Sequence, residues 1–583
     1  MDKNNFDYIV IGAGTAGGII AKKLSDDHRT SVLVLETGTN MTKELSSPNV
    51  VVALTNATNN RQSFNVTTIL EQQLGRQLIT ESGRAIGGSS EHNAMLAVRG
   101  SRDFYDEWAR QVGNQWSYDN IRSLFKKNET YTGGSQEPQE RGFNGPIFVR
   151  QQIIPNQGLI QTLTQATSDV FDIPIVEDYN TGIRDCTFFK SQFTQKAESE
   201  SFIRSSTATG YLNSHIVTQG NEFNSDEFGV NGRKLVIFAK TTVNKILFKR
   251  HKGFQIAVGV EFIKNGVSEV MNARKGIVIS AGQFSSVILQ RSGIGRPDDL
   301  AKAGIATLVD SPNVGHNFQT QFYVGMGVRV ETGRILQVLG TDPNQPSTLG
   351  AFKKQDNPKG GRRLQLLGFP VPVFVPVQDV LINGWQFDDT KPSNVMSIAI
   401  SNLNPTSRGT ILIGHSDPEA YPTIDLNPLA DNDDLNYMVD KYIETYNMVV
   451  RARQLDPGGI YEVVYPNESI FQLADEEKRT ILAAYVRASY TNFAHFGCQC
   501  KMGQVIEEGV VDGFLNVFGT KNLKIADLSI APILPDGNTS TGAQMIGLNA
   551  VRFIRNDEKF DEESSDESSD ESSSSDESRD DQH

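Results

Sequence analysis

Three glycines near the N-terminus have the spacing of a dinucleotide-binding loop. Gly12, Gly14 and Gly17 form the pattern G-x-G-x-x-G. In such a loop the first glycine permits a tight turn, the second lets the backbone approach a pyrophosphate, and the third lets the next helix pack closely on the strand. Glu36 lies nineteen residues beyond the last glycine, where an acidic side chain can bind the hydroxyl pair of a ribose. An acid here favours a ribose without a phosphate, and hence FAD or NAD over NADP.

The residues around these glycines predict the strand–helix–strand unit that the loop needs. Residues 6–14 are predicted to be a buried strand, residues 15–27 a helix and residues 30–38 a second strand. The N-terminus of the helix would present free N–H groups to the phosphates. This context makes a glycine turn without a ligand the weaker alternative. More than 500 residues follow the unit, enough for distant segments to enclose a flavin, which favours FAD.

Length and composition predict a soluble protein with two or three domains or with one large composite fold. The chain has 583 residues, too many for one core at ~100–200 residues per domain. Its content of 38% hydrophobic and 21% charged residues is ordinary for a globular protein. No apolar stretch approaches the ~18–20 residues that span a bilayer, and no signal-peptide pattern opens the chain, so we expect an intracellular protein without a membrane partner. Cys186, Cys498 and Cys500 make no disulfide framework and fit a reducing compartment.

Acidic charge is concentrated at the C-terminus. Residues 557–583 hold thirteen acidic and two basic side chains, a net charge of −11 out of the chain's −14. The rest of the chain is therefore close to neutral and has no motif or basic excess typical of a nucleic-acid binder. The acidic segment is rich in serine and has little apolar surface to bury, so it is predicted to be disordered. The segment could be a solubilising tail or a specific docking segment, and the sequence leaves both alternatives open.

Several separated motifs resemble the glucose–methanol–choline (GMC) family of FAD-dependent oxidoreductases. GRAIGGSSEHNAMLAVRGSRDFYDEW, at 83–108, is similar to the family's first signature, and SAGQFSSVILQRSGIG, at 280–295, to its second. AHFGCQCKMG, at 494–503, and KIADLSIAPILPDGNTSTGAQMIG, at 524–547, resemble its C-terminal active-site motifs. The resemblance extends over residues 6–555. A softer similarity links the chain to GMC-type proteins encoded by giant DNA viruses.

The resemblance implies an α/β fold of two interleaved domains. A Rossmann-like FAD-binding domain would comprise residues 1–150, 230–330 and 490–556, the last also carrying the active-site segment. A substrate domain with a sheet and helices would comprise residues 151–229 and 331–489, and the disordered tail would follow at 557–583. Segments far apart in the sequence would therefore enclose the flavin.

The same resemblance implies an FAD-dependent oxidation of a small alcohol to the carbonyl by hydride transfer to the flavin. Oxygen or another electron acceptor would take the electrons from the flavin, and no metal site is expected. Which alcohol is oxidised, and whether the chain forms a homo-oligomer, stay open. The residues that the glycine pattern and the resemblance place at the cofactor are Gly12, Gly14, Thr15, Ala16, Gly17, Glu36, Arg84, Gly88, Ser89, His92, Asn93, Ala94, Val243 and Asp527.

The resemblance also implies a catalytic pair. The family uses a histidine and, further along the chain, a second histidine or an asparagine; His495 and Asn538, separated by 43 residues, stand at these places. His495 would be the base that takes the alcohol proton, and Asn538 would orient the substrate oxygen. Histidine suits a base because its unperturbed pKa, ~6.5, lies near working pH. A buried core histidine and an asparagine that only bonds a turn are the alternatives.

His92 is the most individual feature of the first signature. Most family members carry an aliphatic residue directly before the asparagine of this motif, here Asn93. Choline oxidases of the family resemble the chain at this point, with a histidine that is bonded covalently to the flavin. Two alternatives are therefore open: a covalent bond from His92 to FAD, and a histidine packed beside the flavin without a bond.

Three segments depart from the family pattern, and one of them, the second signature, is one residue short around Ser285–Val287. Cys498 stands where the family has a glycine, and Thr320 and Gln321 stand where it has an acid and a histidine. These departures and the acidic tail motivate an alternative from another functional class, a structural or assembly protein of a virion with weak or lost activity.

The sequence does not define the substrate pocket. A cationic alcohol such as choline would need a carboxylate and an aromatic cage. The aromatic residues that could form such a cage, line an aryl-alcohol pocket, or simply belong to the core are Phe322, Tyr323, Phe369, Phe374, Trp385 and Phe387.

Overall fold

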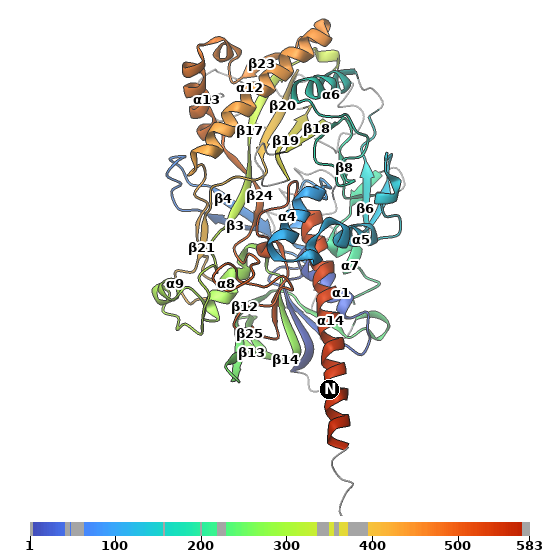
Figure 1. The fold of residues 1–583 in the computed structure, drawn as a ribbon, viewed down its shortest axis with the longest axis vertical. Coiled ribbons are helices and arrows are strands. Elements are labelled where there is room, and N and C mark those ends of the chain that lie inside the picture. The colour runs from blue at the N-terminus through green and yellow to red at the C-terminus, as the bar shows by residue number, and fades with distance from the viewer. Residues whose placement is uncertain are drawn as a thin grey trace, which may run out of the picture.

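Two large β-sheets form the body of the protein, one above the other in Figure 1. The structure is a computed structural model that describes residues 4–40, 47, 63–154, 158–198, 201–217, 229–334, 349–354, 361–370 and 394–573. Helices cover the sheets, so the protein has the mixed α/β fold that the sequence predicts. Among the described residues, no helix is long and apolar enough to cross a membrane.

The first sheet is built on the predicted strand–helix–strand unit. β1 (Asn5–Ile11), α1 (Gly17–Leu24) and β2 (Val32–Leu35) occupy the expected positions. β1 pairs in parallel with β2 on one side and with β14 (Val267–Ile279) on the other, and β11 (Leu235–Phe238) continues the sheet beyond β2. Every residue of β2 and β11 is buried, as expected for parallel strands covered on both faces.

Later segments of the chain complete this sheet. β12 (Thr241–His251), β13 (Phe254–Lys264) and β14 form an antiparallel meander. β25 (Thr520–Lys521) and β26 (Leu523–Ile525) add in parallel to β13 and β14. The C-terminal motif thus lies in the same sheet as the N-terminal glycine loop.

The second sheet is antiparallel, with the strand order β23-β17-β20-β19-β18-β7 and with β24 also paired to β17. All eight residues of β19 and all eight of β20 are buried, so both faces of the sheet are covered. Helices α6 (Gly158–Phe171), α12 (Asn432–Leu455) and α13 (Asp475–Ser489) pack on it (Figure 1). The strands are β7 (Cys186–Phe188), β17 (Gln319–Arg329), β18 (Leu349–Lys354), β19 (Arg362–Phe369), β20 (Val395–Asn402), β23 (Glu462–Tyr465) and β24 (Thr491–Gly497).

β17 and β24 bring the two halves of the molecule together. The predicted division assigns both to FAD-binding segments, 230–330 and 490–556, but their hydrogen bonds place them in the antiparallel sheet. The two strands are antiparallel, so the start of β17, at Gln319, lies beside the end of β24, at Gly497. Gln321 and His495 both lie near this end of the strand pair.

Shorter elements surround the sheets. The helices are α4 (Arg102–Val112), α5 (Tyr118–Asn128), α7 (Thr207–Tyr211), α8 (Ser285–Arg291) and α9 (Pro297–Lys302). The small sheets pair β3 (Ser63–Thr67) with β4 (Ile79–Gly83), β5 (Glu129–Thr132) with β6 (Ile147–Gln151) and β8 (Gln192–Phe193), β9 (Gln195–Glu198) with β10 (Ser201–Arg204), β15 (Ile294–Gly295) with β16 (Val309–Asp310), and β21 (Thr410–Leu412) with β22 (Thr423–Asp425).

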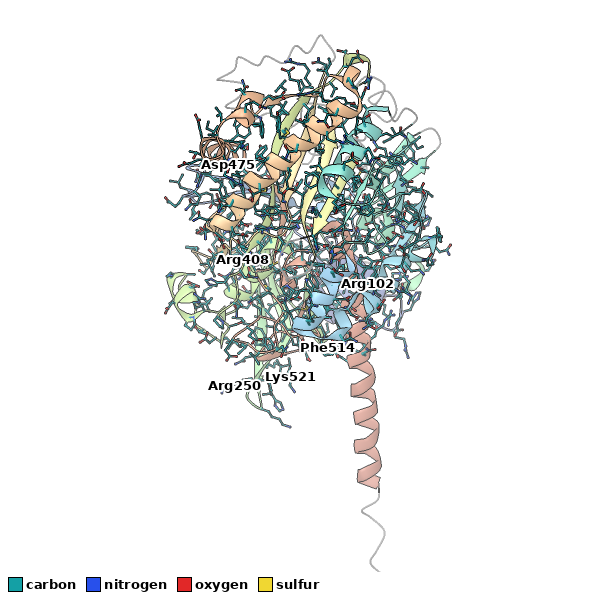
Figure 2. All side chains as sticks on the ribbon, turned by 45° about the horizontal axis from the view of Figure 1, so that its top comes forward. Arg102, Arg250, Arg408, Asp475, Phe514 and Lys521 are labelled. Atoms are coloured by element: carbon teal, nitrogen blue, oxygen red, sulfur yellow. The ribbon has the colours of Figure 1, made fainter. Side chains whose placement is uncertain are left out.

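The C-terminal helix differs from the expectation. α14 (Ser540–Ser573) continues into the acidic segment, where disorder from residue 557 is predicted. Its first part is packed in the core through Phe553 and Ile554, and a helix that is already formed can propagate without a new nucleus. In Figure 2 α14 runs past Phe514 and leaves the body. Residues 574–583 lie outside the described residues.

Candidate active site

A cavity of about 1060 Å³ lies between the two sheets. Ligand pockets commonly measure ~300–1,000 Å³, so this one is large enough for an extended cofactor and a small substrate. Every residue predicted at the site lines it, with the exception of Gly17. The lining residues among those predicted are Gly12, Gly14, Thr15, Ala16, Glu36, Arg84, Gly88, Ser89, His92, Asn93, Ala94, Val243, His495, Asp527 and Asn538.

The three glycines of the N-terminal loop have different surroundings. Gly12 has φ +97°, and a Cβ there would lie 2.4 Å from the carbonyl oxygen of Ser280. A Cβ on Gly17 would lie 2.0 Å from the carbonyl oxygen of Gly12, so both positions are closed by backbone packing. Gly14 is different, because the nearest atom to a Cβ would be 3.8 Å away, in Gly88. Its backbone borders the cavity, and α1 behind it begins without a side-chain cap on its N–H groups.

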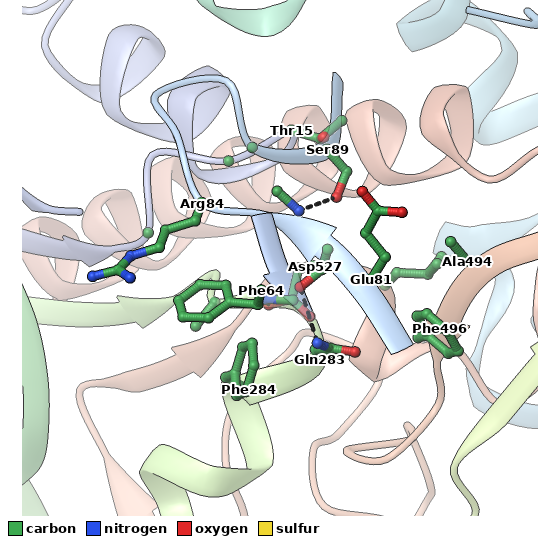
Figure 3. Close-up of a pocket in the computed structure, with 18 of the residues that line it drawn as sticks. Thr15, Phe64, Glu81, Arg84, Ser89, Gln283, Phe284, Ala494, Phe496 and Asp527 are labelled. Carbon is green, nitrogen blue, oxygen red and sulfur yellow. Dashed lines mark hydrogen bonds between the residues drawn. The ribbon is translucent and has the colours of Figure 1, made fainter. Parts of the chain in front are cut away.

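The Gly-Gly-Ser-Ser turn of the first signature packs directly on this loop. Gly87 donates its backbone N–H to the carbonyl oxygen of Ala13 at 2.8 Å. A Cβ on Gly88 would lie 2.7 Å from the Cα of Gly14, so only glycine allows this approach. The Ser89 hydroxyl accepts a hydrogen bond from the Gly83 N–H at 2.9 Å, which ties the turn to β4 (Figure 3). Two separate glycine turns thus form one backbone cradle.

Glu36 anchors the loop from the end of β2. Its Oε2 accepts from the Ala13 N–H at 2.9 Å and its Oε1 from the Gly38 N–H at 2.7 Å. The carboxyl is buried, and desolvation raises its pKa while these N–H donors oppose the shift. Glu36 lines the cavity directly after β2, the position where the acid of a Rossmann-like fold is expected to meet the ribose of a dinucleotide.

Asp527 joins the second signature to the C-terminal motif. Its Oδ2 accepts from the Gly282 N–H at 2.9 Å and from the Ser285 hydroxyl at 2.6 Å, and its Oδ1 accepts from the Ser529 N–H at 2.8 Å. Burial raises its pKa. Asp527 therefore holds the two motifs together where they line the cavity.

Arg84 lines another wall of the cavity. Its guanidinium lies over the ring of Phe64, at 5.3 Å from the ring centroid (Figure 3).

His92 is held in the wall as a neutral imidazole. It is 5% exposed, and its buried Nε2 has no hydrogen-bond partner among the described residues. Its Nδ1 lies 3.9 Å from Oε1 of Glu81. Burial, helped by the charge of Arg204, lowers the pKa of His92 to about 4. The ring therefore carries a nitrogen lone pair at neutral pH.

His495 enters the cavity from β24. The strand is irregular there, because Ala494 has φ +56° and the pairing with β17 shifts register between Thr320 and Phe322. The imidazole ring stacks on Phe493 at 5.2 Å. Its Nδ1 lies 2.7 Å from Oε1 of Gln321, and its accessible surface faces the cavity. Burial lowers the pKa of His495 to about 4, so this ring is also neutral.

Asn538 has a defined amide orientation. Its Oδ1 accepts from Nε2 of Gln365 at 3.0 Å. The amide oxygen is therefore engaged with the protein, and the Nδ2 group is the donor that Asn538 can offer to the cavity. A neutral imidazole and a side-chain amide donor thus line the same cavity as the glycine cradle.

Apolar side chains line the part of the cavity beside this pair. Phe369 and Tyr323, two of the predicted aromatics, belong to that wall, whereas Phe322 stacks on Tyr490 at 4.5 Å in the core. Phe374, Trp385 and Phe387 lie outside the described residues. The apolar cluster comprises Met95, Leu96, Phe193, Leu367, Phe369 and Ala399, with Tyr323 and Phe493 packed against it.

Two sequence profiles of the GMC oxidoreductase family match the chain, one over residues 6–323 and the other over residues 405–547. The chain belongs to the GMC oxidoreductase family. Its members are generally FAD-dependent oxidoreductases, which supports FAD as the cofactor that the cradle would hold.

Relatives of this GMC oxidoreductase act on different substrates. It is 27% identical to pyranose dehydrogenase 2 of Leucoagaricus meleagris, over 92% of this chain and 90% of the relative. It is also 27% identical to human mitochondrial choline dehydrogenase, over 95% of this chain and 90% of the relative. Among solved structures, a formate oxidase superposes with a TM-score of 0.78 at 20% identity, covering 96% of this chain and 99% of the other. Pyridoxine 4-oxidase from Mesorbium loti gives 0.75 at 22% identity, covering 94% and 99%.

Three polar residues of this GMC oxidoreductase contact the site, although the motifs predict a site role for none of them. Gln321 and Gln365 bond the predicted catalytic pair from β17 and β19. Arg204, at the end of β10, is buried and donates to the side-chain oxygen of Asn93 at 2.7 Å, which holds the first signature beside His92. Each contact joins segments far apart in sequence, so no local pattern indicates it.

Cys498, which stands where the family has a glycine, has a backbone conformation that favours glycine. Cys498 has φ +72°, a region that glycine enters freely and that costs other residues ~1–2 kcal/mol. The glycine expected from the family pattern suits this conformation. Cys498 is buried, and burial raises the pKa of its thiol, so the substitution adds no reactive thiolate.

Proposed function

We propose that the protein oxidises an alcohol to the carbonyl, with His495 as the base and Asn538 as the hydrogen-bond donor to the substrate oxygen. The observation that carries the proposal is that a neutral imidazole and a side-chain amide donor line one cavity with the glycine cradle. When bound, FAD supplies the two-electron acceptor that takes the hydride from the carbinol carbon.

The residues of the cavity divide between cofactor and substrate. The backbone of Gly14 and Gly88 would accommodate a pyrophosphate, and Glu36, which lines the same cavity, would bind the ribose. The supporting observation is that a Cβ at Gly88 would close this approach. His495 and Asn538 lie on the side of the C-terminal motif and the apolar cluster.

Each member of the catalytic pair has one task. The Nε2 of His495 accepts the proton of the alcohol hydroxyl, because the ring is neutral above a pH of about 4 and then has one nitrogen without a hydrogen. The Nδ2 group of Asn538 donates to the substrate oxygen and keeps the hydroxyl directed at the imidazole.

We propose a neutral alcohol with an apolar body as the substrate. The cluster around Leu96, Phe193 and Phe369 contributes apolar contacts, and the Glu81 carboxylate of the same cavity lies beside His92, at 3.9 Å from its Nδ1. Choline would need a carboxylate beside an aromatic cage, and a sugar would need several hydrogen-bond partners. In a panel with peroxide and dye-reduction detection, benzyl alcohol should be oxidised with a higher kcat/KM than choline or glucose. A preference for choline or glucose would contradict this assignment.

His495→Ala tests the catalytic assignment. The rate of anaerobic flavin reduction by the best alcohol should fall at least ~100-fold, the lower end of what a general base contributes. His316→Ala is the matched control, since His316 pairs with Asp299 at 2.9 Å and does not line the cavity. An unchanged rate in His495→Ala rules out His495 as the base. A colourless protein that forms large assemblies would instead favour the structural role.

We also propose that His92 can attach FAD covalently. The supporting observation is its buried, neutral ring with an Nε2 that has no partner among the described residues and lies in the cavity wall. Acid precipitation of fully loaded protein should leave yellow colour in the pellet, and His92→Ala should release it. A colourless pellet with yellow supernatant from the unmodified protein means that FAD is bound without a bond to His92.

A further inference from the structure

Gln321 replaces a histidine of the family pattern and lies in contact with His495. It is fully buried in β17, at the point where the pairing with β24 shifts register. Its Nε2 donates to the carbonyl oxygen of Leu403 at 2.9 Å and to that of Pro535 at 2.7 Å. Leu403 follows β20, and Pro535 belongs to the loop that carries Asn538. The amide of Gln321 therefore connects three segments of the active site.

These partners define which way the amide points. A backbone carbonyl oxygen only accepts, so two of them require the NH₂ end of the amide. The flipped orientation would place three oxygens against each other. The Oε1 atom must therefore face Nδ1 of His495, at 2.7 Å. Because Oε1 only accepts, Nδ1 must carry a hydrogen, and in the neutral ring Nε2 then has none.

We propose that Gln321 is a positioning residue that selects the tautomer of His495 whose Nε2 can accept the alcohol proton. The inference rests on the proposed function, in which His495 is the base. When the alcohol O–H bond breaks, its proton passes to Nε2 and its electron pair forms the carbonyl as hydride leaves the carbon. The Nδ1–H bond to Gln321 is kept throughout, so the ring does not turn during the transfer.

A neutral amide also keeps the base weakly basic. Burial is the single cause of the lowered pKa of His495. The elements packed against β24 bring the titratable groups Glu81 on β4, Asp527 before the 3-10 helix η8 (Leu528–Ile530) and Tyr323 on β17. None of them is a cause of the shift. A carboxylate in place of the Gln321 amide would add a charge beside Nδ1 and stabilise the protonated ring.

The first test measures the tautomer directly. In FAD-loaded protein with ¹⁵N-labelled histidine, the nitrogen chemical shifts of His495 report which nitrogen carries the hydrogen; the signal is assigned by its absence in His495→Ala. We expect a protonated Nδ1 and a bare Nε2. A protonated Nε2 overturns the proposal. This measurement needs neither a known substrate nor a stable variant at position 321.

The second test separates positioning from packing. Gln321→Met keeps the length but removes the acceptor, and should mix the tautomers and slow flavin reduction by benzyl alcohol at least ~10-fold, part of the ~10²–10⁴ that a base contributes. Gln319→Met is the control, because Gln319 is equally buried in β17 and donates to Pro532, yet does not contact His495. Equal losses in both variants, with an unchanged tautomer, overturn the proposal.

Gln321→Glu gives a signature that packing alone cannot produce. The pH at which flavin reduction falls to half should rise by at least one unit, about a tenfold change in proton affinity. An unshifted profile in a folded, yellow Gln321→Glu protein counts against the role of Gln321. The two proposals can fail separately. If the alcohol reduces the flavin of His495→Ala at the normal rate, the proposed function is wrong. A protonated Nδ1 in the unmodified protein would still show that Gln321 selects the tautomer of His495.

Discussion

Hydrogen-bond partners fix the orientation of single side chains at this site. Gln365 donates to Oδ1 of Asn538, which leaves its Nδ2 group for the cavity. Gln321 pairs with Nδ1 of His495, which leaves Nε2 of the ring for the cavity. Glu36 accepts from two backbone N–H groups of the loop and the strand end. Such pairing costs no reorganisation when substrate arrives, which is the property that makes polar groups effective in catalysis.

Glu36→Ala should weaken FAD retention without unfolding the protein. The variant loses charge-assisted hydrogen bonds worth ~1.5–3 kcal/mol, about 10- to 100-fold in affinity. Purified protein should contain less FAD per chain, measured by absorbance, and recover it at higher added FAD. Glu36→Gln keeps an acceptor and should lose less. An unchanged FAD content in Glu36→Ala would contradict the role of this carboxylate.

Secondary-structure elements contribute close backbone approaches and strand irregularities. The loop before α1 and the turn before the 3-10 helix η1 (Gly88–Glu91) touch through glycines, which removes side chains from the space of the cofactor. On the other side of the cavity, the positive φ of Ala494 in β24 turns His495 toward the cavity. The predicted catalytic residue His495 therefore lies where the regular pairing between β17 and β24 is interrupted.

Substitutions at Gly14 and Gly17 should have different effects. Gly17→Ala places a Cβ 2.0 Å from a backbone oxygen, so it should lower Tm markedly. Gly14→Ala meets nothing nearer than 3.8 Å, so the protein should fold, but the methyl group would stand at the cofactor and reduce its affinity. Thermal unfolding of the FAD-free proteins and titration with FAD measure the two effects. Equal Tm values for the two variants would show that the loop rearranges.

At the scale of the whole molecule, the two sheets enclose one cavity because the chain passes between them repeatedly. The N-terminal loop, the two signatures and the C-terminal motif contribute walls, and β17 and β24 cross from one half to the other. His92 is thereby buried and His495 half-buried, and the lowered pKa of each, about 4, keeps both rings neutral at pH 7. Closing the site therefore links folding stability to pH.

Stability should fall as the pH is lowered from about 6.5 toward 4. The pKa of His92 and that of His495 are about 4 in the folded protein, below the ~6.5 of an unfolded chain. The unfolded state therefore binds more protons in this window, and each histidine removes ~1.4 kcal/mol per pH unit. Urea unfolding at pH 7 and pH 4.5 measures the loss. His92→Ala should weaken the pH dependence.

The acidic end of α14 should be dispensable for the site. The helix is anchored by Val551, Phe553 and Ile554 in the core, and Glu558 accepts from the Tyr8 hydroxyl at 2.9 Å. Deleting residues 559–583 should leave Tm and FAD content unchanged. Deleting residues 550–583 should lower both, because buried side chains of this size contribute ~2–5 kcal/mol each. A large loss of Tm in the shorter deletion would assign the acidic segment a structural role.

The sequence by itself determined the features that depend on neighbouring residues. The glycine loop, β1, α1, β2 and Glu36 lie within one strand–helix–strand unit, and their spacing follows from local backbone geometry. The mixed α/β fold and the family follow from ordered motifs, and the residues predicted at the site line one cavity apart from Gly17, whose contact is with the loop itself. The start of α14 follows from its apolar pattern, but its continuation to Ser573 does not.

Only the tertiary structure decided which partners orient the reacting groups. Gln321 meets His495 across 174 residues, Gln365 meets Asn538 across 173 and Arg204 meets Asn93 across 111. As a departure from a motif, Gln321 counts against activity, whereas in the fold it hydrogen-bonds His495, the proposed base. The physical reason is that such contacts depend on strand register and on irregular pairing between β17 and β24, which are set by packing of the whole sheet and leave no periodic trace in the chain.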